Sequence, residues 1–149
     1  MRFSFMFSVL SSESANLALG DRVEITGTRG ANAGQLQLTS PILVRVGAGV
    51  APAPVTVTGA AANSLANDGR LVTLAGFTVT TVGGGTGAAF NVTGTSADGA
   101  TVTVRVSALN TGLTRANFVV GQTYTVTGIL TQFNGAAQIK VRLRTDVTP

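Results

Sequence analysis

The sequence predicts an all-β protein, and three observations support this fold class. Charged residues make up only 11% of the chain while hydrophobic residues make up 44%, and many of the rest are Thr. β-Branched side chains suit a pleated surface, and the 19 glycines supply turns. Asn-Gly and Asp-Gly pairs, which are strong hairpin signals, separate the alternating runs. At 149 residues the chain can form one well-packed domain, or one small domain plus part of another.

The chain contains an internal repeat. Residues 20–38, GDRVEITGTRGANAGQLQL, recur as GQTYTVTGILTQFNGAAQI at residues 121–139, so every matched position is offset by the 101 residues that separate Gly20 from Gly121. Glycines and apolar residues recur in phase, which indicates a duplicated structural unit. The same offset places the counterparts of residues 69–100 before Met1, so we expect the first copy to begin part-way through the unit.

Apolar alternation divides the second unit into five expected strands, at residues 71–82, 90–95, 101–107, 122–132 and 137–144. Gly76 interrupts the first strand, and its missing side chain favours a bulge or sharp bend. Residues 83–87 are a glycine-rich turn, and Asp98-Gly99 predicts a tight hairpin before the third strand. Residues 108–118 lose the alternation and predict a short helix or a loop. Asn134-Gly135 predicts a type I′ hairpin between the last two strands.

This order of three strands, an irregular connection and a hairpin is that of the oligonucleotide/oligosaccharide-binding (OB) fold, a five-stranded Greek-key barrel. A long, bent first strand fits this barrel because it pairs in both halves of the sheet. We therefore predict a partial OB-like repeat at residues 1–50, a Pro/Ala linker at 51–60 and a complete OB-fold domain at 61–149. The end of the linker alternates Val with Thr and predicts an additional edge strand.

The inward faces of the five strands define the expected core. Its members are apolar residues of these strands. They are Leu71, Leu74, Phe90, Val92, Val102, Val104, Val106, Tyr124, Val126, Ile129, Ile139, Val141 and Leu143.

Two short patterns also resemble a known group of proteins. The pattern G-x-x-[VY]-x-[IV]-T-G, followed by a Gly and Q-[LI], occurs in both copies, and G-x-L-V-x-L-x-G precedes it at Gly69–Gly76. Together they resemble the tandem OB-fold modules found beside secreted bacterial nucleases and phosphoesterases. The resemblance spans nearly the whole chain but rests on turn and core positions. It implies a fold, and no catalytic residue is transferred, because in such proteins these lie in neighbouring domains.

The residue inventory argues against catalysis. The chain has no His and no Cys, which removes common bases, thiol nucleophiles and zinc sites, and its six carboxylates are scattered. Gly83, Gly85 and Ala88 satisfy G-x-G-x-x-[GA], but a strand follows rather than the helix N-terminus that a dinucleotide requires. We therefore expect no enzyme, no cofactor and no metal site.

The fifth strand carries the predicted binding site. Along it an apolar face alternates with a cationic face formed by Lys140, Arg142 and Arg144. Residues on one face of a strand stand about 6.7 Å apart, so the row suits the phosphates of an extended single strand. The alternative interpretation is an edge strand whose Lys and Arg prevent edge-to-edge pairing.

Three further residues complete the predicted site. Arg105 points outward from the third strand, Arg115 is a second flanking cation, and Phe133 offers a stacking surface beside a turn. Phe90 and Tyr124 share the phase of the core and are unsuited to stacking. The predicted function is a non-catalytic module that holds an extended polyanion, above all single-stranded nucleic acid. The net charge of +4 is weak support for such a partner.

The alternative function is structural. An incomplete first unit would expose unpaired backbone and apolar residues such as Phe3, Phe5 and Phe7. Either the second unit covers it, or another subunit donates strands and builds an extracellular or cell-surface fibre or lattice; a third reading is that Met1 is internal to a longer gene. Residues 1–15 faintly imitate a signal peptide, but the offset favours a strand there.

The sequence also bears on location. Few Lys and abundant Thr favour an extracellular or cell-surface protein. The longest apolar stretch is far shorter than the roughly 18 residues that a transmembrane helix requires. The absence of Cys leaves the redox compartment open.

Overall fold

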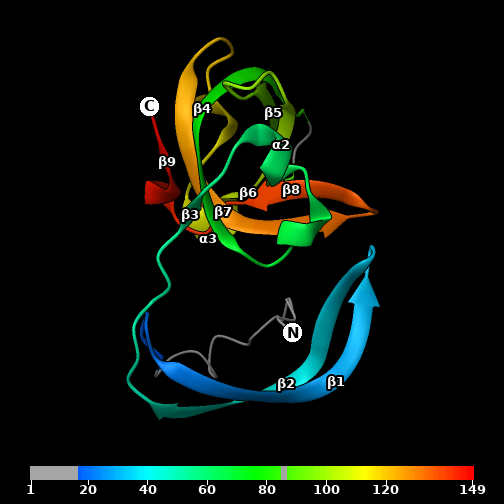
Figure 1. Ribbon diagram of the computed structural model, residues 1–149, viewed down its shortest axis with the longest axis vertical. Helices are drawn as coiled ribbons and strands as arrows, with labels where there is room; N and C mark the ends of the chain where they lie inside the picture. The colour runs from blue at the N-terminus through cyan, green and yellow to red at the C-terminus, as the bar shows by residue number, and fades with distance from the viewer. Residues whose placement is uncertain (1–16, 85–86) are drawn as a thin grey trace. The chain divides into compact units, whose positions relative to one another are not determined.

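The computed structural model is an all-β molecule that divides into two units, Met1–Ala53 and Pro54–Pro149 (Figure 1). It describes residues 17–84 and 87–149. The predictions for residues 1–15, including the three phenylalanines of that segment, lie outside the described residues. No helix in the described part of the chain is long and apolar enough to cross a membrane.

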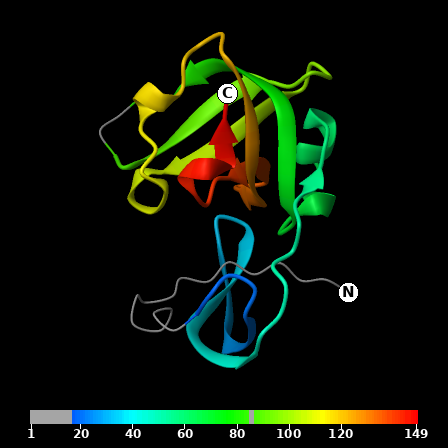
Figure 2. The same ribbon diagram turned by 90° about the vertical axis from the view of Figure 1, so that its left-hand side faces the viewer.

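Five strands of the second unit close into a barrel. They are β4 (Leu71–Val82), β5 (Ala89–Thr95), β6 (Thr101–Ser107), β7 (Thr123–Phe133) and β8 (Ala136–Lys140). Their order is β4-β5-β6-β8-β7, and pairing of β7 with β4 completes the circuit (Figures 1 and 2). All neighbours are antiparallel except β6 and β8, which are parallel. The predicted five-stranded barrel is confirmed.

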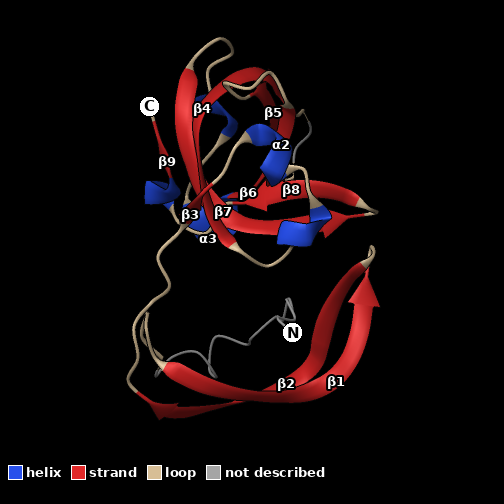
Figure 3. Ribbon diagram, in the orientation of Figure 1, coloured by secondary structure: helices blue, strands red, loops and turns tan. Residues whose placement is uncertain are grey.

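Short elements surround the barrel (Figure 3). They are β3 (Val55–Thr56), α2 (Gly59–Ala62), η1 (Leu65–Asn67), α3 (Ala108–Thr111), η2 (Arg115–Asn117), η3 (Arg144–Asp146) and β9 (Val147–Thr148). β3 pairs in parallel with β4, as the alternation at the end of the linker predicts, and β9 pairs antiparallel with β7. α3 and η2 fall where the sequence loses its alternation.

The bend in β4 lies where the sequence predicts it. Gly76 has a φ of 68°, a backbone conformation that glycine adopts without steric cost. The register with β7 shifts between Leu74 and Phe77. Before the shift the even-numbered residues Val72 and Leu74 are buried, and after it the odd-numbered residues Phe77 and Val79 are buried. Both halves of the strand therefore face the same core.

The core matches most of the predicted set. Ten of its members are buried: Leu74, Phe90, Val92, Val102, Val104, Val106, Tyr124, Val126, Ile139 and Val141. Leu71 and Ile129 pair with each other and are only half-buried. The structure adds residues that lie after the bend in β4 or in the connections, such as Phe118, whose ring meets Phe90 edge-on at 6.0 Å between centroids.

The prediction of a fifth strand over residues 137–144 is wrong at its C-terminal end, because β8 ends at Lys140. The carboxylate of Asp146 accepts hydrogen bonds from the backbone N–H groups of Arg142 and Leu143, both at 3.1 Å. These bonds compete with a strand ladder and turn the chain into η3. Leu143, predicted to be a core residue, is consequently 45% exposed.

In the first unit the described strands form a two-stranded antiparallel hairpin, β1 (Arg22–Asn32) and β2 (Gln35–Gly47). The bounds of β1 lie 101 residues before those of β7, and β2 begins 101 residues before β8. All five residue pairs of the β7–β8 ladder recur at this offset in β1–β2. The turns agree as well, with φ values of 50° and 84° at Ala33-Gly34 and of 50° and 80° at Asn134-Gly135.

Even a close backbone approach is repeated. A Cβ atom added at Gly27 would lie 3.0 Å from the carbonyl oxygen of Thr39, and one added at Gly128 would lie 2.5 Å from that of Lys140. One difference matters: Arg29 stands where β7 has the buried Leu130. The hairpin backbone is conserved between the copies, whereas the inner surface is not.

Candidate binding surface of the barrel

The predicted row of three cations is not a row in the structure. Lys140 is the last residue of β8, whereas Arg142 lies in the turn that follows it and Arg144 begins η3. The alternation that predicts the row depends on a strand that stops too early. The three side chains must therefore be considered one by one.

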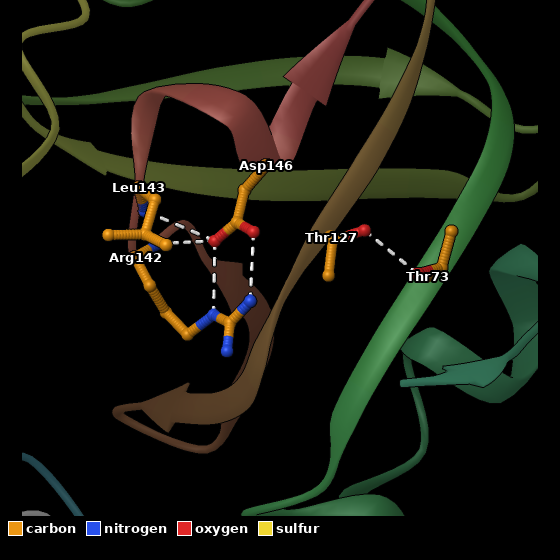
Figure 4. A network of polar contacts seen from close by, with 5 residues as sticks. All are labelled: Thr73, Thr127, Arg142, Leu143 and Asp146. Carbon is orange, nitrogen blue, oxygen red and sulfur yellow. Dashed lines mark hydrogen bonds and ion pairs between the residues drawn. The ribbon is translucent and has the colours of Figure 1, made fainter. Parts of the chain in front are cut away.

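Arg142 is bound within the fold. Its Nη2 lies 2.8 Å from Oδ1 of Asp146 and its Nε lies 3.0 Å from Oδ2, so the ion pair is bidentate (Figure 4). Burial alone raises the pKa of Asp146, but hydrogen bonds from the Arg142 side chain and from the backbone outweigh it, so the pKa lies below its ordinary value of 3.8. Because Asp146 is 7% exposed, removing Arg142 would leave a buried carboxylate without its partner.

The same view shows how β4 is joined to β7 beside this ion pair. The hydroxyl groups of Thr73 and Thr127 lie 2.8 Å apart across the two strands (Figure 4). Such pairs on the outer surface stabilise a sheet modestly. Thr73 and Thr127 thus link β4 to β7 through their side chains as well as through the backbone.

Arg115 and Arg144 hold neutral groups. The Nε of Arg115 donates to the carbonyl of Gly83 at 2.8 Å, and its guanidinium carbon lies 4.7 Å from the centre of the Phe90 ring, a cation–π geometry. Arg144 donates to the carbonyl of Gly112 at 3.1 Å, at the end of α3. Neither forms an ion pair with a carboxylate of the described residues, so no such carboxylate offsets the positive charge of either side chain.

Arg105 and Lys140 lie side by side on the outside of the barrel. They are register partners on the parallel strands β6 and β8. The preceding pair, Val104 and Ile139, is fully buried, so alternation places Arg105 and Lys140 on the opposite, outward face. The Nη1 of Arg105 donates to the side-chain oxygen of Asn91 on β5 at 3.0 Å. Sequence analysis missed Asn91, although its position opposite an outward Arg follows once the register is known.

The one exposed aromatic ring of the predicted site is on this face. Ile129 is the register partner of Lys140, and Phe133 lies four residues further along β7, in the same phase. At roughly 3.3 Å per residue, Ile129 and Phe133 are about 13 Å apart along β7. Phe133 is 58% exposed.

The charge balance of the second unit favours anions. It has one Lys and five Arg against three Asp, at positions 68, 98 and 146. Asp146 is paired with Arg142, and Asp98 accepts hydrogen bonds from Ser96 and from the backbone of Ala60, which lower its pKa to about 2. With six basic and three acidic side chains (6 − 3), residues 54–149 carry a formal net charge of +3.

The described residues contain no group of three or more potential metal ligands. In comparisons with known proteins, no family model, no curated protein and no solved structure matches the chain.

Proposed function

We propose that the second unit is an OB fold and that the β1–β2 hairpin belongs to a second, related unit. The strand order, with its single parallel pair between the third and fifth strands and a bent first strand, supports the first part. The offset of 101 residues, shared by strand bounds, register and turns, supports the duplication.

We further propose that this barrel is a non-catalytic module that binds an extended polyanion, specifically single-stranded nucleic acid, across the outer face of β5, β6, β8 and β7. The observation that carries the proposal is the outward pair Arg105 and Lys140 on adjacent strands. In OB folds the second and third strands, here β5 and β6, form the face that binds oligonucleotides. The site thus differs from the one expected along a single strand.

Each side chain of the surface has a distinct role in this proposal. Arg105 and Lys140 contact phosphate oxygens, and Asn91 orients the guanidinium of Arg105. Phe133 stacks on one base, an interaction that tolerates any sequence. Arg115 and Arg144 add long-range attraction from the end of the barrel, while Arg142 is structural.

Binding is expected to be weak and sensitive to salt. With roughly −0.7 per phosphate contact for single strands, two to four contacts imply a slope of about −1.4 to −2.8 for log affinity against log salt. Fluorescence anisotropy of a labelled oligonucleotide at several salt concentrations measures this slope. The double variant Arg105→Ser/Lys140→Ser is expected to reduce its magnitude by about 1.4.

A matched control separates the site from net charge. Arg22→Ser/Arg29→Ser removes two exposed positive charges from the hairpin and should leave the slope nearly unchanged. Circular dichroism checks that both variants are folded. Equal losses in the two double variants would show non-specific attraction, and absence of binding by the parent protein at low salt would reject the proposal.

A further inference from the structure

The outer edge of β2 has no partner strand among the described residues, where β1 and β2 pair only with each other. A two-stranded hairpin is marginally stable alone, and three or more strands are normally needed. An unpaired edge also presents a row of backbone donors and acceptors to other chains. The edge of β2 is thus a place where a further strand can add.

The second half of β2 suits this pairing. Residues 42–46 read Ile-Leu-Val-Arg-Val, a run of high β-propensity with one charge. Three of its side chains are exposed, Ile42 at 64%, Val44 at 52% and Val46 at 49%. The first half of the strand is less suitable, because Ser40 has a φ of 49° and Pro41 has no N–H group to donate.

The segment is complementary to itself in one register. If two antiparallel copies meet with Val44 opposite Val44, then Leu43 lies opposite Arg45, and Ile42 lies opposite Val46, the residue at which the β1–β2 register shifts. The three exposed apolar side chains of each copy then form one continuous surface. Arg45 is kept away from its counterpart, and it is already paired with Asp21 at 2.8 Å. Moving the register by two residues places either Arg45 against itself or Pro41 within the ladder.

We propose that two copies of this chain associate through residues 42–46 of β2, antiparallel and centred on Val44, which creates a continuous four-stranded sheet. This inference goes beyond polyanion binding and is independent of it. Two five-residue segments bury less surface than a standard interface, so the association is weak and reversible.

Sedimentation equilibrium of the full chain tests the proposal. We expect the weight-average mass to rise from monomer toward dimer between about 10 µM and about 1 mM. Val44→Glu and Val44→Lys should each remain monomeric, because the two-fold axis places like charges together. An equimolar mixture of the two variants should dimerise again. Val50→Glu, at a 95% exposed position outside the strand, is the control and should behave like the parent.

Crosslinking identifies the register directly. The chain contains no Cys, so Val44→Cys introduces the only thiol. Under mild oxidation it should form a disulfide-linked dimer much faster than Val50→Cys, because paired strands bring the two Cα atoms within the roughly 4.4–6.8 Å that a disulfide spans. A parent protein that stays monomeric at about 1 mM, equal crosslinking of the two Cys variants, or no recovery in the Glu and Lys mixture would overturn the proposal.

Discussion

At the scale of single residues, the cations of the second unit differ in the charge of their partners. Arg142 binds the carboxylate of Asp146, whereas Arg105, Arg115 and Arg144 donate to neutral oxygens. An ion pair with a buried carboxylate leaves little attraction for a ligand, while an arginine on a neutral acceptor keeps its full charge. The partner thus decides whether an arginine supports the fold or a ligand.

Asp98 provides the first residue-scale prediction. Hydrogen bonds from Ser96 and from the backbone of Ala60 lower its pKa to about 2, below the ordinary value of 3.8. The ionised carboxylate therefore stabilises the fold above pH 3.8, and this contribution is lost as the pH falls toward 2. Asp98→Asn should lower the free energy of unfolding at pH 7 and flatten its dependence on pH in that window.

Urea denaturation between pH 2 and pH 7 measures both effects. Asn-Gly remains a favoured hairpin turn, so the variant tests the charge rather than the turn. Glu24→Gln in β1, whose carboxylate forms no ion pair among the described residues, is the control. An unchanged pH profile in Asp98→Asn would show that the hydrogen bonds to Asp98 do not depend on its charge.

At the scale of secondary-structure elements, the sequence predicts what depends on local pattern. Alternation, the glycine-rich turn after residue 82 and the Asp-Gly turn before residue 101 predict the bounds of β4 and β6 to the residue. The end of β8 escapes prediction because its cause, Asp146, lies six residues beyond the last strand residue and acts through its side chain. The same error produces the misplaced cationic row and the misassigned Leu143.

The bend in β4 carries the element-scale prediction. At Gly76 an added Cβ would meet Ala97 Cβ at 3.5 Å, an ordinary contact, so the cost of a substitution comes from the φ of 68°. Gly76→Ala should lower the free energy of unfolding by about 1–2 kcal/mol. Gly76→Asn should cost less, because Asn tolerates this conformation. Gly84→Ala is the control, because Gly84 has open space around it and no positive φ. Thermal denaturation measures the stability of all three variants. Equal stability of the two Gly76 variants would mean that the bend relaxes.

At the scale of the whole molecule, composition predicts the all-β class and the order of strands predicts a five-stranded barrel, but neither gives the residue register between distant strands. The pairing of β6 with β8 places Arg105 beside Lys140, although the two residues lie 35 positions apart in the sequence (140 − 105). No local pattern encodes that neighbourhood, and it emerges only when the barrel closes. The proposed binding surface therefore depends on topology, whereas the proposed self-association edge of β2 lies in one continuous segment and can be identified from its residues once their exposure is known.

The last prediction is that the second unit folds without the first. Residues 54–149 contain every buried hydrophobic residue of the described part of the chain, whereas no apolar residue of the described hairpin is buried. A fragment comprising residues 54–149 should fold cooperatively, with a Tm within about 4 °C of the main transition of the full chain, a difference of at most roughly 1 kcal/mol. It should bind the oligonucleotide with the same salt slope but fail to dimerise. Calorimetry, anisotropy and sedimentation on the fragment measure these three properties. A fragment that unfolds, or one that dimerises as the full chain does, would contradict this division of roles between barrel and hairpin.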